Sequence, residues 1–260
     1  MSRSDTPTLK GRKEEEPFQY LVMDKTDKCY VFLDQNFDFQ NSQRFVLVEK
    51  VTDSKLNEMT QKVTGEDLKD DNYTHCDQCS TFFRTFCLRH PLYFVPDRLW
   101  DSMLAPPCMS KAEKSLPMFL EIKESSIPNA GQGIFALMDI PIGTCFGPYR
   151  GEKLTEKNAH GYIWEIRRKG KEPIYRDGRN PEKSNWMRFI NSARSEKEQN
   201  LLAFQYCGKI FYRAFKPIFN RCELLVWYGD DFGAELGVFK TSGKSSRAPR
   251  QSVPRNPFIY

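Results

Sequence analysis

The sequence predicts a mainly β fold with a few short helices. From Met118 to Phe239, short runs of strand-forming residues alternate with turns that contain Gly and Pro, a pattern typical of β-rich domains. No long amphipathic helical repeat interrupts these runs. Apolar residues make up 39% and charged residues 28% of the 260-residue chain, which is an ordinary composition for a globular protein.

Composition also argues against membrane and secreted proteins. No apolar run approaches the roughly 20 residues that cross a bilayer, and the polar N-terminus has no secretory signal. We therefore expect an intracellular protein whose eight cysteines are thiols or metal ligands rather than disulfides. The formal charge of +5 suits acidic surroundings such as chromatin.

Residues 1–239 divide into five segments. Residues 1–16 are polar and predicted to be disordered. Residues 17–72 form a β-like extension of unknown role, in which the non-periodic stretch 50–72 is expected to be a linker. The strands of the extension are expected at Tyr20–Met23, Cys29–Leu33 and Phe45–Val48. A cysteine cluster at 73–92, a Pro-rich connector at 93–117 and a dense region at 118–239 follow.

The dense region holds six predicted strands and is followed by a basic tail. Cys207-Gly208 separates two of the strands and favours a tight hairpin, and Trp164, Trp186 and Trp227 are assigned to packing. Residues 240–260 have no acidic residue, and we expect a disordered tail capable of weak phosphate contacts to nucleic acid. The six strands are Phe119–Lys123, Gly133–Ala136, Tyr162–Ile166, Leu201–Tyr206, Ile210–Ala214 and Glu223–Tyr228.

The spacing of Cys76, Cys79, Cys87 and His90 is C-x2-C-x7-C-x2-H, two close pairs that can surround one Zn²⁺ tetrahedrally. Four protein ligands leave no open position, so we predict a structural zinc knuckle. Two alternatives stay open: the thiols merely flank an apolar patch, or His75 replaces His90, although its place beside Cys76 makes chelation by both awkward.

Five blocks between His75 and Phe239 resemble the PR/SET domain of the PRDM family in order and spacing. The resemblance is greatest to the member that marks meiotic recombination hotspots, which carries a similar zinc knuckle. It implies a SET fold with knot-like C-terminal threading over residues 118–239. The blocks are Asn129–Phe135 (NAGQGIF), Phe146–Gly151 (FGPYRG), Asn185–Asn191 (NWMRFIN), Glu198–Tyr206 (EQNLLAFQY) and Glu223–Gly229 (ELLVWYG).

The resemblance implies methyl transfer from S-adenosylmethionine to a histone lysine, most of all lysine 4 and lysine 36 of histone H3. It also implies a nuclear protein of chromatin that acts in transcription or meiotic recombination on an H3 tail or a nucleosome. By position, Tyr149, Tyr212 and Tyr228 match the tyrosines around the target amine, and Tyr228 matches the catalytic one. The cofactor-contacting segments match Ala130, Gly131, Gln132, Tyr162, Asn191 and Ser192.

Methyl transfer gives these residue types a chemical role. The enzyme aligns two reacting atoms, and an apolar channel favours the neutral, nucleophilic lysine amine. Tyrosine rings exclude water and hold methylammonium groups, while their hydroxyls can bond the amine. Gly131 and Gly133 allow a close backbone approach to the cofactor, and the amide of Asn191 offers hydrogen bonds to it.

Two departures from the family define the alternatives. Ser192 stands where many SET enzymes have His, which leaves open the alternative of a catalytically silent PR domain that acts as a protein-interaction module, although the tyrosines argue for activity. The family's C2H2 zinc fingers are not found in this sequence, so no sequence-specific reading of DNA is expected. A further alternative is a nucleic-acid-binding zinc protein that uses the basic tail.

Overall fold

The computed structural model describes residues 16–38, 42–65, 68, 71–99, 106–156 and 162–227. The predicted disorder of residues 1–15, the basic tail and the catalytic candidate Tyr228 lie outside these residues. Within them the chain is mainly β, as predicted, with two short α-helices and one 3₁₀ helix. No helix among the described residues is long and apolar enough to cross a membrane.

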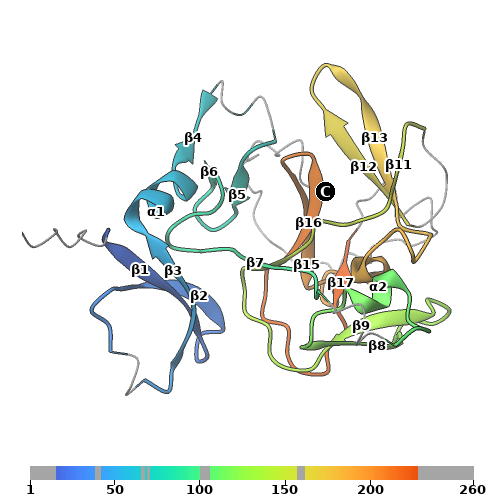
Figure 1. Cartoon of the computed structure of the whole chain (residues 1–260), viewed down its shortest axis with the longest axis horizontal. Helices are drawn as coiled ribbons and strands as arrows, with labels where there is room; N and C mark the ends of the chain where they lie inside the picture. The colour runs from blue at the N-terminus through green and yellow to red at the C-terminus, as the bar shows by residue number, and fades with distance from the viewer. Residues whose placement is uncertain are drawn as a thin grey trace, which may run out of the picture.

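The N-terminal extension forms a separate antiparallel sheet on one side of the molecule (Figure 1). Its strands run in the order β2-β1-β3, with bounds Phe18–Asp24 (β1), Cys29–Asp34 (β2) and Phe45–Thr52 (β3). All three predicted strands are therefore confirmed. Leu21, Tyr30 and Val51 are buried in its core together with Leu56.

The predicted linker at 50–72 is wrong over its first half. Residues Asp53–Met59 form helix α1, and Lys62–Val63 form strand β4. Sequence periodicity missed α1 because only Leu56 in it is buried, so the helix has no apolar stripe. Strand β4 pairs with β6 (Thr81–Phe83), which also pairs with β5 (Thr74–Cys76).

A six-stranded sheet forms the centre of the dense region, in the order β14-β17-β15-β16-β10-β7. The predicted hairpin is confirmed: β15 and β16 are antiparallel, and Cys207 and Gly208 between them have φ of 47° and 68°. The strands are β7 (Tyr93–Val95), β10 (Thr144–Phe146), β14 (Asn191–Ser192), β15 (Leu201–Tyr206), β16 (Lys209–Ala214) and β17 (Leu225–Val226).

Three strands of this sheet, β7, β10 and β14, lie where the sequence predicted no strand. Strand β7 comes from the predicted connector and pairs in parallel with β10, so that segment is not merely a linker. Strand β17 pairs in parallel with both β14 and β15 and separates them. It covers only two residues of the predicted strand Glu223–Tyr228. The knot-like threading and the domain boundaries stay predictions.

Two smaller sheets and two short helices surround this centre. One is the pair β8 (Leu120–Glu124) and β9 (Gln132–Ala136), and the other has the order β11-β13-β12. The latter strands are β11 (Glu152–Leu154), β12 (Ile163–Arg168) and β13 (Lys171–Asp177). Helix α2 is Lys111–Lys114, which Ser110 and Glu113 cap reciprocally, and the 3₁₀ helix η2 is Trp186–Phe189.

The main core lies between the central sheet and these flanking elements. It contains Trp164 and Trp186, and Trp227 is also buried, which confirms their assignment to packing. Cys145 is buried, whereas Cys108, Cys207 and Cys222 are exposed thiols. Tyr149 and Tyr212 belong to the same core, so two of the predicted site tyrosines are integral to the folded centre.

Candidate active site and zinc centre

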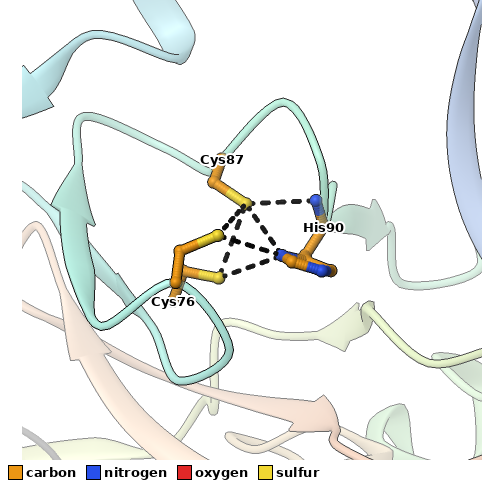
Figure 2. Close-up of side chains that lie close together, drawn as sticks. Cys76, Cys87 and His90 are labelled. Atoms are coloured by element: carbon orange, nitrogen blue, oxygen red, sulfur yellow. Dashed lines mark hydrogen bonds between the residues drawn. The ribbon is translucent and has the colours of Figure 1, made fainter.

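The structure brings the four predicted zinc ligands together (Figure 2). Nδ1 of His90 lies 3.4 Å from Sγ of both Cys76 and Cys79 and 3.3 Å from Sγ of Cys87. The Cys76–Cys87 and Cys79–Cys87 sulfur distances are 3.4 and 4.0 Å. A tetrahedron with Zn–S and Zn–N bonds of about 2.3 and 2.0 Å has edges of about 3.5–3.8 Å, so the four atoms fit one Zn²⁺.

Other interpretations of the cluster fit less well. The sulfur separations exceed the about 2.05 Å of a disulfide bond. His75 instead places its Nδ1 2.9 Å from Asp77, and it is not among the clustered ligands. Burial and the neighbouring Cys76 raise the pKa of the Cys87 thiol. A cation would reverse that effect by stabilising the thiolate.

The two described tyrosines of the predicted channel pack against each other. Tyr149 is 5% and Tyr212 0% exposed, and their ring centroids are 6.4 Å apart. Tyr149 donates from its hydroxyl to the Tyr162 carbonyl at 2.9 Å, and Nε1 of Trp164 donates to the Tyr212 hydroxyl at 2.6 Å. The Tyr149 hydroxyl thus donates in a defined direction, and the Tyr212 oxygen is held by the bond it accepts, both inside an apolar surrounding.

Two residues that support these tyrosines were not singled out from the sequence for this role. Trp164 was assigned to packing, yet its N–H also fixes the Tyr212 hydroxyl. Gly178 faces the Tyr149 hydroxyl so closely that any Cβ there would collide with it. Neither relationship leaves a signal in sequence, because the two members of each pair are far apart in the chain.

Five of the six predicted cofactor residues come from two segments that meet. Ala130 and Gly131 lead into strand β9, which begins at Gln132; Gly131 and Gln132 are exposed, and Gly131 has a φ of 73°. Asn191 and Ser192 form strand β14. Nδ2 of Asn191 donates to the Gln132 carbonyl at 3.0 Å, so the two predicted segments lie side by side.

A buried carboxylate lies behind this junction. Oε1 of Glu223 accepts from Nδ2 of Asn191 at 3.2 Å. The same carboxylate accepts from the hydroxyls of Ser125 and Ser126 at 2.7 and 2.5 Å. Glu223 is only 7% exposed. Its isolation at the start of an apolar run was the one sequence signal that could have identified it.

The contacts of Tyr162 differ from those of the other predicted cofactor residues. Its side chain is 40% exposed, and the guanidinium of Arg188 lies over its ring at 4.7 Å. The Tyr162 ring thus packs on Arg188, whereas Asn191 bonds the 130–132 segment. The Tyr162 carbonyl accepts from Tyr149, so its backbone belongs to the tyrosine pair.

Comparisons with known proteins identify the family. The family profile described as PR domain zinc finger protein 2, PR domain, matches residues 120–239. The chain is 40% identical over 237 residues to histone-lysine N-methyltransferase set-17 of Caenorhabditis elegans, covering 85% of this chain and 83% of that protein. The chain belongs to the PR/SET-domain family.

Further comparisons show how much of other members it spans. Human histone-lysine N-methyltransferase PRDM7 is 41% identical over 189 residues, which are 71% of this chain and 37% of that protein. A solved methyltransferase domain of human PR domain-containing protein 2 is 31% identical and covers 50% of this chain and 95% of that domain, with a TM-score of 0.42. The chain thus spans only a part of PRDM7.

As a member of the PR/SET family, the protein is a lysine methyltransferase that uses S-adenosylmethionine. One observation in particular indicates that the residues present fit such a ligand. The Ser192 hydroxyl oxygen is buried and has no hydrogen-bond partner among the described residues, whereas buried polar groups are normally bonded. A polar ligand that reaches Ser192 would supply the missing partner.

Proposed function

We propose that this PR/SET protein methylates histone H3, at its lysine 4, its lysine 36 or both, in the nucleus. Two relatives that are 40% and 41% identical are named histone-lysine N-methyltransferases, which supports a histone substrate. The observation that carries the proposal is the buried pair Tyr149 and Tyr212, each of whose hydroxyl oxygens is held by a hydrogen bond. Tyr228, just after the last described residue, would complete the set as the catalytic tyrosine.

The residues of this chain would act mainly by excluding water and by aligning the two reacting atoms. S-adenosylmethionine, when bound, supplies the methyl group on a positively charged sulfur. The tyrosine pair lies in an apolar core, where burial lowers the pKa of a lysine amine and favours its neutral form. Tyrosine hydroxyls can bond that amine and orient its lone pair. Holding two reacting atoms in line contributes about 7–11 kcal/mol to such a reaction.

The cofactor-binding face would be the junction of two segments. We propose that Ala130, Gly131 and Gln132 contact the methyl donor through their backbone, because Gly131 has no Cβ and adopts a positive φ. Asn191 and Ser192 would bond its polar groups, and Tyr162 would line the edge of the site. Zn²⁺ on Cys76, Cys79, Cys87 and His90 would stabilise the fold without taking part in the reaction.

The partners follow from this substrate. We propose that the protein acts on an H3 tail or a nucleosome in transcription or meiotic recombination. The basic tail at 240–260 would add weak, salt-dependent contacts to phosphates. Sequence-specific reading of DNA forms no part of the proposal.

The test uses zinc-loaded full-length chain, recombinant histone H3 and radiolabelled S-adenosylmethionine. Wild type is expected to label H3, and H3 variants with arginine in place of lysine 4 or of lysine 36 show which lysine accepts the methyl group. Tyr228→Phe and Tyr212→Phe are expected to reduce the rate at least about tenfold, or about 1.4 kcal/mol of barrier. Labelling that survives both substitutions would contradict the tyrosine mechanism.

A second outcome would favour a different function. If folded, zinc-loaded protein labels neither H3, other histones nor nucleosomes, the PR domain is an interaction module, consistent with Ser192 in the place of the usual His. A thermal shift on adding S-adenosylmethionine separates the two cases further, since a ligand that binds the folded state raises its melting temperature.

A further inference from the structure

We propose that Glu223 is a positioning residue for the methyl donor, which joins the Ser125–Gln132 loop to Asn191 and so shapes the cofactor site. The inference rests on the proposed function, because it takes the junction of the loop and strand β14 as the place where S-adenosylmethionine binds. It adds a residue that does not itself touch the donor but decides how the groups that touch it are presented.

Glu223 holds the start of the loop that follows strand β8. Oε2 of Glu223 accepts from the backbone N–H of Ser126 at 3.0 Å and from its hydroxyl at 2.5 Å. Oε1 accepts from the Ser125 hydroxyl at 2.7 Å. Hydrogen bonds to a carboxylate are stronger than those between neutral groups. Three of them therefore fix the start of the loop that leads to Ala130 and Gly131.

Glu223 also sets the orientation of the Asn191 amide. Its Nδ2 donates both to Oε1 of Glu223 at 3.2 Å and to the Gln132 carbonyl at 3.0 Å. Both partners can only accept there, so the amide nitrogen must face them, and its two hydrogens are used. Asn191 is thus constrained to present its oxygen to a ligand. An oxygen acceptor matches the ammonium or adenine amino group of the methyl donor.

Gly133 shows that the site is built around this carboxylate. A Cβ at Gly133 would collide with Oε1 of Glu223 and lie 3.3 Å from Nδ2 of Asn191. Strand β9 reaches Glu223 also through an isolated bridge between Phe135 and Glu223 and through the N–H of Leu224, which donates to the Ile134 carbonyl at 2.8 Å. The close approach of β9, the loop and β14 therefore depends on glycine at 133 and a carboxylate at 223.

The deciding variant is Glu223→Gln, which keeps the size of the side chain. Its single oxygen can accept from the Ser126 N–H only if its NH₂ faces Nδ2 of Asn191, which places two donors against each other. In the other orientation its NH₂ faces the Ser126 N–H, so in either case two donors meet and the link between the loop and Asn191 is broken. Glu58→Gln, an exposed position on helix α1, is the matched control for loss of one carboxylate.

The expected result is a selective loss of donor binding. By isothermal titration with S-adenosylmethionine, Glu223→Gln weakens the Kd at least about tenfold, which is about 1.4 kcal/mol, and Glu58→Gln leaves it unchanged. In steady state the KM for S-adenosylmethionine rises by a similar factor, and the KM for the H3 peptide stays within about threefold. A merely structural role would lower the active fraction, and hence kcat, with both KM values unchanged.

The outcomes separate this inference from the proposed function. If wild type binds S-adenosylmethionine and Glu223→Gln binds it equally well, the positioning role is wrong and the methyltransferase remains. If wild type does not bind it, the proposed function and the premise of the inference both fail. Should Glu223→Gln not fold, the double variant Ser125→Ala/Ser126→Ala keeps the carboxylate and its bond to Asn191. It must then weaken the Kd at least about threefold for the role to stand.

Discussion

The indole N–H of Trp164 donates a hydrogen bond to the hydroxyl of Tyr212 over 2.6 Å. The two side chains are 4% and 0% exposed. An indole nitrogen can only donate, so the Tyr212 oxygen accepts this bond and its own hydrogen points elsewhere. Trp164 therefore holds the oxygen of a tyrosine in the proposed channel and excludes donation by its hydroxyl toward the indole.

Trp164→Phe is expected to lower kcat on an H3 peptide by roughly tenfold, because the Tyr212 hydroxyl loses its fixed direction (about 1.4 kcal/mol). The free energy of unfolding should fall by about 1–3 kcal/mol, from the lost bond and the smaller ring. Tyr212→Phe provides the control. If Trp164 acts through that hydroxyl, the double variant is no slower than Tyr212→Phe alone. Independent, additive losses would contradict the relationship.

Gly178→Ala is expected to disturb Tyr149, since the new Cβ would occupy the place of its hydroxyl. Overpacking of this kind costs about 1–3 kcal/mol, measured as a lower urea midpoint, and kcat should fall with it. In a Tyr149→Phe background the hydroxyl is gone, so the same substitution should cost at least about 1 kcal/mol less. An equal cost in both backgrounds would show that the strain arises elsewhere.

Zinc removal is expected to destabilise the whole protein. A structural zinc contributes about 10–16 kcal/mol in isolated finger peptides. A loss of even about 3 kcal/mol would lower Tm by roughly 6–12 °C in a chain of this size. Mass spectrometry of native protein should find one zinc ion per chain, and Cys79→Ser should lower both zinc content and Tm. Cys108→Ser, an exposed thiol outside the cluster, is the control and should change neither.

The N-terminal sheet should carry a pH-dependent part of the stability at Asp24. Arg44 bonds this carboxylate through Nε at 2.9 Å and Nη2 at 2.6 Å, and the Arg44 guanidinium holds its pKa below the usual value. A lowered folded-state pKa means that the stabilisation is complete above the unfolded value of about 3.9. It is lost as the pH falls through the still lower folded-state pKa.

We therefore expect Asp24→Asn to lower the free energy of unfolding at pH 7 by about 2 kcal/mol, and by progressively less below about pH 4. Denaturant titrations in excess zinc, compared between wild type and variant at each pH, measure this difference. Arg44→Met should flatten the same part of the profile. A difference between wild type and Asp24→Asn that stays constant down to about pH 2.5 would rule out this carboxylate as the source.

Much of the fold was predictable because local pattern and burial agree. The hairpin of β15 and β16 follows from two apolar runs around Cys207-Gly208, and the strands of the N-terminal sheet follow from short runs of strand-forming residues between polar turns. Helix α1 was missed because a short helix with one buried residue has almost no periodic signal. Strand β7 was missed because its three residues acquire their place only by pairing with β10, a strand distant in the chain.

The candidate site was also predictable only in part. The zinc ligands were predictable because four ligands close together in the chain are a local pattern, and the structure gathers the same four atoms. Asn191 and Gln132 came only from a family resemblance. The contacts of Trp164 with Tyr212 and of Glu223 with Ser126 depend on chain segments 48 and 97 positions apart. Composition and spacing hold no information about such pairs.

The position of β17 has a consequence for how the protein is made. Leu225 and Val226 fill the gap between β14 and β15, so during synthesis the central sheet stays incomplete until these residues leave the ribosome. Until then β15 has an unpaired edge, which invites pairing with other chains. Parallel pairing between distant segments is also slow to form. The stage of synthesis before Val226 has emerged is therefore exposed to aggregation, and overexpression at low temperature should raise the soluble yield.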